Sequence, residues 1–113
     1  MSKDFKDFQK YFKHYQKLFG LTGYQVYFKY EPIEESFANI SINQTSMVVT
    51  VRLNSNLPEK DIPFKDIKRT AKHEAIHLLV GRLEQNGRYR YSSENEIFEA
   101  VEELVNRIWD LIE

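Results

Sequence analysis

The sequence contains no cysteine. This absence excludes disulfide bonds, and it limits the protein ligands of any metal site to histidine, aspartate and glutamate. A strong charge of one sign is also missing, because 16 basic and 17 acidic residues give a formal net charge of −1. Dedicated nucleic-acid-binding domains are usually strongly basic, so the composition predicts no nucleic-acid partner.

Long apolar runs are absent as well. No stretch approaches the roughly 20 residues that a membrane-spanning helix needs, and the N-terminal region lacks the basic-then-apolar pattern of a secretory signal. We therefore expect no membrane partner and a cytoplasmic location. A chain of 113 residues, 42% of them hydrophobic, suffices for one hydrophobic core, and we expect a single domain over residues 1–113.

The first helix is predicted from the spacing of aromatic residues. Between Lys3 and Phe19 they recur at steps of three and four, which is the period of an amphipathic helix. Gly20 and Gly23 indicate its end and the following turn. The aromatic positions are Phe5, Phe8, Phe12, Tyr15 and Phe19.

Three segments that resemble β-strands follow, at residues 24–31, 36–43 and 46–54. The last two are joined by a connection short enough for a hairpin, so we expect them to be antiparallel neighbours. A second helix is predicted from about residue 64 to residue 85, ended by Asn86 and Gly87.

Ser93 and Glu96 have the spacing of a capping box, which predicts a third helix from there to the C-terminus. The order of elements predicts an α+β fold. It would consist of an N-terminal helix, a small three-stranded and mostly antiparallel sheet, and two further helices.

Residues 73–77 read HEAIH. On a helix, His73 and His77 lie one turn apart on the same side, so two imidazole nitrogens can bind one ion at about 2.0–2.1 Å. Glu74 lies about 100° further round the helix axis, where it can act on a metal-bound water without itself binding the metal. This is the HExxH arrangement of zinc peptidases, in which the glutamate is the general base.

The alternative is that both histidines are ordinary core or surface residues. Two observations argue against it. The histidines point away from the apolar stripe of their helix, and the small residues Thr70 and Gly81 on their side would leave room for an ion and a substrate. The stripe is formed by Ile67, Ala71, Ala75 and Leu78.

A zinc peptidase site has three protein ligands and one open position. Because His14 belongs to the first helix, we expect the acidic third helix to supply the third ligand. Glu102 borders the apolar stripe of that helix and is the first choice. Glu99 is the alternative, because FEAVEEL resembles the glutamate helix of thermolysin-like gluzincins; that resemblance implies Glu99 as the ligand and Glu103 as a carboxylate that orients a histidine.

Taken together, these elements resemble a minimal zincin, and more specifically the small phage and prophage proteins of the metallopeptidase type. The similarity extends from Phe37 to Ile108. It rests on the segments FANISIN, VVTVRLN, TAKHEAIHLLVGRLE and RYRYSSENEIFEAVEELVNRI. The resemblance implies a zinc ion and a hydrolytic fold, and it implies no particular substrate.

These features predict a zinc-dependent peptidase. A zinc ion held by His73, His77 and a glutamate would lower the pKa of its bound water towards about 7, and Glu74 would accept the proton and pass it to the leaving amine. An edge strand, either 36–43 or 46–54, would hold a peptide or protein substrate by strand addition.

Donors for the developing oxyanion are expected in the loop between the two site helices. Tyr89 and Tyr91 are the candidates, together with Arg88 and Arg90. The alternative function is a non-catalytic binding module of a phage or prophage. Its metal site would be structural or vestigial, and its aromatic first helix would contact a partner.

Overall fold

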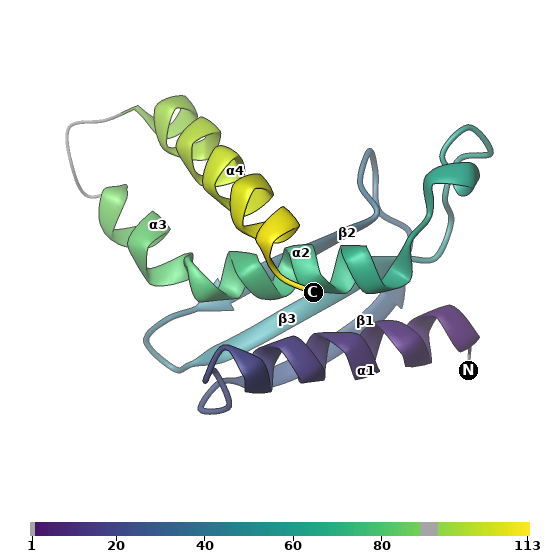
Figure 1. Cartoon of the computed structure of the whole chain (residues 1–113), viewed down its shortest axis with the longest axis horizontal. Coiled ribbons are helices and arrows are strands. Elements are labelled where there is room, and N and C mark those ends of the chain that lie inside the picture. The colour runs from purple at the N-terminus through teal and green to yellow at the C-terminus, as the bar shows by residue number, and fades with distance from the viewer. Residues whose placement is uncertain (1, 89–92) are drawn as a thin grey trace.

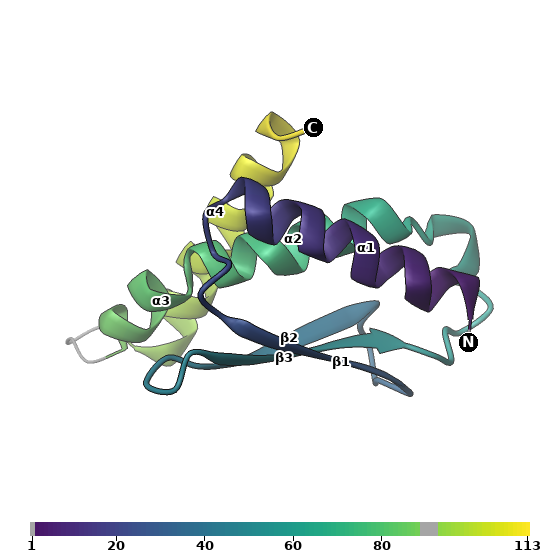
Figure 2. The same ribbon diagram turned by 90° about the horizontal axis from the view of Figure 1, so that it is seen from below.

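The computed structural model of the chain describes residues 2–88 and 93–113 (Figure 1). The fold is α+β, as predicted, and α1 and α2 cover one face of the sheet (Figure 2). No helix within the described residues is both long enough and apolar enough to span a membrane. The elements are α1 (Lys3–Leu18), β1 (Gln25–Glu31), β2 (Ala38–Asn43), β3 (Val48–Asn54), the 3-10 turn η1 (Ile62–Phe64), α2 (Ile67–Leu79), α3 (Gly81–Gly87) and α4 (Glu94–Leu111).

Helix α1 follows the predicted aromatic spacing. Phe5, Phe8, Phe12 and Tyr15 are buried, and they form the larger part of the core together with apolar residues of α2 and the sheet. The rings of Phe8 and Phe12 contact Phe28 of β1 edge-on, with centroids 6.4 Å and 5.6 Å away. Aromatic contacts therefore fix α1 on the sheet.

The sheet has the strand order β1-β3-β2. Strands β2 and β3 are antiparallel, as the short connection predicted, whereas β1 and β3 are parallel. The sheet is therefore mixed, with one parallel and one antiparallel pair, and not mostly antiparallel as predicted. Because β3 lies in the centre, the prediction that segment 46–54 could be an edge strand was wrong; β2, within segment 36–43, is an edge.

The prediction of one continuous helix over residues 64–85 was wrong. Asp66 caps α2, its side chain accepting a hydrogen bond from the Arg69 amide at 3.0 Å, and the helix ends before Val80. A Cβ atom on Gly81 would lie 2.9 Å from Gln44 Nε2 and 3.0 Å from Ile42 Cδ1. The chain turns here because Gly81 packs directly against the end of β2 and the residues after it.

Helix α4 begins with the predicted capping box. Ser93 Oγ accepts from the Glu96 amide at 3.2 Å, and Glu96 Oε1 accepts from the Ser93 amide at 3.0 Å. Val105 of α4 is fully buried and packs against Ile76 and Val80 in a second apolar cluster. This cluster fixes α4 across α2, and it thereby determines which side of α4 faces the histidines.

Candidate metal centre

His73 and His77 project from α2 with their ring nitrogens close together. The two Nε2 atoms lie 3.2 Å apart. Two nitrogens that bind one tetrahedral ion at about 2.05 Å each would lie about 3.3 Å apart. Their side chains are only 24% and 15% exposed. The pair therefore has the spacing of two ligands of one cation.

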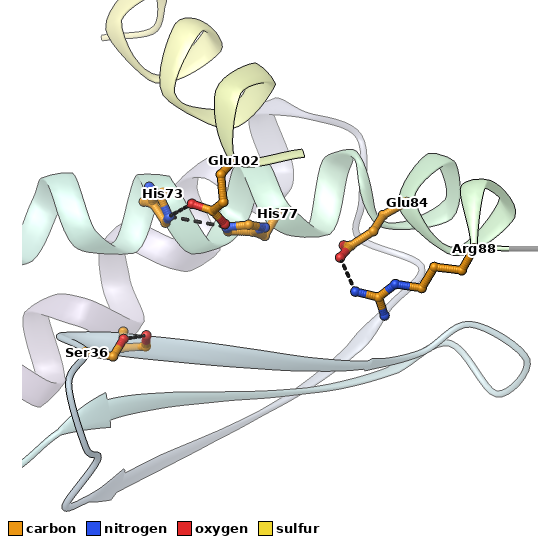
Figure 3. Close-up of polar contacts among 7 residues, drawn as sticks. Ser36, His73, His77, Glu84, Arg88 and Glu102 are labelled. Atoms are coloured by element: carbon orange, nitrogen blue, oxygen red, sulfur yellow. Dashed lines mark hydrogen bonds and ion pairs between the residues drawn. The ribbon is translucent and has the colours of Figure 1, made fainter. Parts of the chain in front are cut away.

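Glu102 approaches both histidines from α4 (Figure 3). Its Oε1 atom lies 3.0 Å from His77 Nε2, and its Oε2 atom lies 3.9 Å from His73 Nε2. The structure thus brings together the three residues that the sequence suggested as ligands, from two helices that cross.

The other candidate ligands lie elsewhere. Glu99 is exposed and is not among the residues that line the cleft beside the histidines. Glu103 is exposed and forms an ion pair with Arg107 at 2.6 Å. His14 lies exposed on α1, where its ring contacts Tyr15. The geometry therefore favours Glu102 over the alternative Glu99.

Glu74 is a buried carboxyl beside this group. It is 5% exposed, and its Oε2 atom has no hydrogen-bond partner in the described part of the chain. Its burial, and to a lesser extent the nearby Glu102, raise its pKa to about 8. A buried carboxyl without a partner is costly, and a cation or a hydrogen-bond donor beside it would reduce that cost.

Two carboxylates thus compete for the role of third ligand. Ligand atoms of His73, Glu74 and His77 all lie within 4.8 Å of one another, which is compatible with one ion. Glu102 Oε1 lies 3.0 Å from His77 Nε2, which is close to the separation of two ligands of one ion, whereas its Oε2 atom lies further from His73 Nε2, at 3.9 Å. The distances of Glu102 to the histidines favour it as the third candidate ligand, with Glu74 beside the group.

Both imidazoles favour the neutral form. Burial lowers the pKa of His73, and the neighbouring His77 lowers it further against an opposing effect of Glu102. Burial also lowers the pKa of His77, opposed by Glu84. Neutral imidazole is the form that binds metal ions, so burial keeps both rings in the form that a metal site would need.

Trp109 is a site residue whose role sequence reasoning missed. Its ring centroid lies 4.8 Å from that of His73 at an interplanar angle of 73°. Its Nε1 atom donates a hydrogen bond to the Arg69 carbonyl at 3.0 Å. The sequence spacing could have indicated that Trp109 lies near the site. Trp109 follows Glu102 by about two helical turns and so lies on the same face of α4.

An open cleft of about 1090 Å³ lies beside the histidines. Its walls come from β2 and from the three helices α2, α3 and α4. Thr70 and Gly81 line it, as expected of small residues that leave room for a substrate. On the α3 side it is bordered by the ion pair of Glu84 with Arg88, at 2.8 Å (Figure 3).

The edge of β2 presents main-chain groups to this cleft. The Asn54 amide donates to the Phe37 carbonyl at 2.9 Å, so Phe37 is a hydrogen-bonded partner of the strand next to it. Hydrogen-bonded and outward-facing residues alternate along an antiparallel pair, which directs the main-chain groups of Ala38, Ile40 and Ile42 to the free edge. Ser36 Oγ donates to the Ala38 carbonyl at 2.5 Å, so the groups of Ile40 and Ile42 are the most accessible to a ligand.

Of the predicted oxyanion donors, Tyr89, Arg90 and Tyr91 lie outside the described residues. Arg88 is exposed at the rim of the cleft, with its guanidinium on Glu84. The prediction of donors in this loop therefore stays a prediction.

No protein-family model and no curated protein sequence matches the chain. The resemblance to zincins therefore stays a prediction from the sequence.

Proposed function

We propose that the protein is a zinc-dependent peptidase that hydrolyses an amide bond of a peptide or protein. One observation supports this proposal above all. Two imidazoles 3.2 Å apart and a carboxylate oxygen 3.0 Å from one of them meet beside the buried carboxyl of Glu74, whose Oε2 atom has no hydrogen-bond partner among the described residues. An ordinary packing role would not explain why four titratable groups gather beside an open cleft.

His73, His77 and Glu102 would hold the ion. Zinc bound there would supply a water with a pKa near 7 and would polarise a substrate carbonyl. The two neutral imidazoles and one carboxylate form a donor set that is typical of catalytic zinc sites, which keep one position open.

Glu74 would move the proton. Its carboxyl is close to the ligand atoms of both histidines, and its Oε2 atom has no hydrogen-bond partner within residues 2–88 and 93–113. A cation nearby favours the ionised form and so would lower the pKa of Glu74 from about 8. The carboxylate would then accept a proton from the attacking water and donate it to the leaving amine nitrogen.

Strand β2 would hold the substrate. The free main-chain groups of Ile40 and Ile42 face the cleft edge, and an extended peptide can add to such an edge by pairing with them. A peptide bound in this way would lie between β2 and the histidine side of α2, next to the proposed reacting groups. The cytoplasmic location and the phage or prophage origin remain predictions from the sequence.

The test compares wild-type protein with Glu74→Gln. Both are purified without added metal, reconstituted with zinc, and analysed for metal content and for cleavage of a diverse peptide library by mass spectrometry. We expect Glu74→Gln to retain zinc and to lose about 100- to 10,000-fold in hydrolysis. Glu99→Gln, a matched change on exposed α4 surface, should retain both properties.

Other outcomes separate the alternatives. A wild-type protein that binds no zinc after reconstitution excludes the peptidase. Suppose instead that both proteins bind zinc, but that neither cleaves the peptide library or any single host or phage protein. That result would support the non-catalytic binding module with a structural metal site.

A further inference from the structure

Three contacts of different kinds join Arg69 of α2 to the last turns of α4. The Arg69 guanidinium carbon lies 3.9 Å from the centroid of the Trp109 ring, within the range of a cation–π interaction. Trp109 Nε1 donates to the Arg69 carbonyl at 3.0 Å, and Arg69 also forms an ion pair with Asp110 at 3.1 Å. We call Arg69 and Trp109, with these contacts, the helix clamp.

The helix clamp lies in line with the candidate ligands. Arg69, His73 and His77 follow one another at steps of four residues on one side of α2. Glu102 and Trp109 lie about two turns apart on one side of α4. The helix clamp therefore fixes one end of the contact between the helices, and Glu102 meets the histidines at the other end.

His73 lies between these two ends. Its Nδ1 atom is buried and has no partner in the part of the chain that the structure describes. A histidine that binds a metal usually donates this N–H to a carboxylate or carbonyl, which fixes the ring. Here the indole of Trp109, 4.8 Å away, packs against the ring instead.

We propose that Trp109 is a positioning residue, which orients the His73 ring by packing and, with Arg69, holds α4 where Glu102 reaches both imidazoles. The consequence for metal affinity rests on the proposed function, whereas the positioning of His73 can be measured without metal. The composition makes this measurement simple. The chain has one tryptophan to replace and three histidines whose imidazole signals must be distinguished.

The experiment measures zinc affinity by competition with a chromophoric chelator in four proteins. Trp109→Leu removes the ring, and Trp109→Phe keeps an aromatic ring against His73. Leu111→Ala is the matched control, because Leu111 is on the same helix and 83% exposed. We expect Trp109→Leu to weaken zinc binding about 10- to 100-fold, Trp109→Phe to restore most of the loss, and Leu111→Ala to remain within about twofold of wild type.

The second measurement records the imidazole ¹H–¹⁵N spectrum of the metal-free proteins. His14 is exposed on α1 and serves as an internal reference. Trp109→Leu should shift the His73 signals and leave those of His14 in place. If Trp109→Leu does not fold, Arg69→Met takes its place. This change removes the guanidinium that lies over the indole, at a half-exposed position, and should weaken zinc binding several-fold.

Two results would overturn the proposal. The first is wild-type zinc affinity in the folded Trp109→Leu protein, or in Arg69→Met if only that variant folds. The second is a metal-free spectrum in which the His73 signals do not change. Failure of the proposed function looks different. In that case no protein binds zinc, while the metal-free spectrum still reports whether Trp109 positions His73.

Discussion

The imidazole of His77 and the carboxylate of Glu102 lie 3.0 Å apart on two crossing helices. Helix α3 and the segment that precedes α4 separate these residues in the chain, so the contact depends entirely on how α4 packs on α2. An ion held by both helices would therefore link metal binding to the docking of α4.

Glu102→Gln removes the charge of the third ligand and preserves its size. Because the amide is a poor zinc ligand, we expect the zinc affinity to fall at least about 10-fold, measured by chelator competition. Glu99→Gln is the control and should bind zinc like wild type. A loss in Glu99→Gln with none in Glu102→Gln would assign the third ligand to Glu99.

Zinc should stabilise the protein against heat. A ligand at 100 times its dissociation constant stabilises the folded state by about 2.7 kcal/mol. For a chain of this size that corresponds to a rise in Tm of roughly 10 °C, which differential scanning calorimetry would detect and an excess of chelator should reverse. His77→Ala should show no rise, and an equal rise in this variant would indicate zinc binding elsewhere.

Glu74 should make the metal-free protein less stable as the pH rises. Its pKa is raised from 4.5 to about 8 on folding, so between these values the folded state binds the proton that the unfolded state has lost. The stabilising effect of the protonated group is complete below pH 4.5 and is lost progressively up to pH 8. Glu74→Gln, which mimics the protonated group, should therefore gain about 3 kcal/mol relative to wild type between pH 5 and pH 8.

Urea unfolding of chelator-treated protein across this pH range measures the effect. Glu103→Gln is the matched control, because Glu103 is exposed on α4, and its profile should follow that of wild type. Parallel profiles for Glu74→Gln and wild type would contradict the buried, protonated state of Glu74.

Gly81→Ala tests the packing of the turn after α2 on the sheet edge. The added Cβ would lie 2.9 Å from Gln44 Nε2 and 3.0 Å from Ile42 Cδ1. Both atoms end flexible side chains, so we expect a moderate loss of about 1 kcal/mol in the free energy of unfolding. Gly87→Ala, whose Cβ would meet only Ile97 at 3.8 Å, should lose nothing, and Ile42→Val should partly rescue Gly81→Ala.

Much of the fold could be predicted from local sequence patterns. The aromatic spacing of α1 and the capping box of Ser93 are short-range signals, and the structure bears both out. The end of α2 before Val80 could not be predicted in this way, because it depends on the contact of Gly81 with Ile42 and Gln44. The parallel pairing of β1 with β3 likewise could not be predicted from the local sequence of either strand.

In the candidate site too, relations within one helix could be predicted, whereas contacts between helices could not. The histidine spacing within one helix fixes the relation of His73 to His77, and the apolar stripe of α4 indicated Glu102. The contacts of Trp109 with His73 and Arg69 join two helices, and neither helix alone reveals them.

Helices α2, α3 and α4 line the cleft beside the free edge of β2, and this arrangement has a consequence for self-association. An unpaired strand edge invites the edge of a second molecule, which is a common route to aggregation. A partner sheet with its helices on the same face would bring them towards the space beside β2 that α2, α3 and α4 border. A lone extended chain carries no such layer, so we expect this edge to pair with a flexible peptide more readily than with a second sheet.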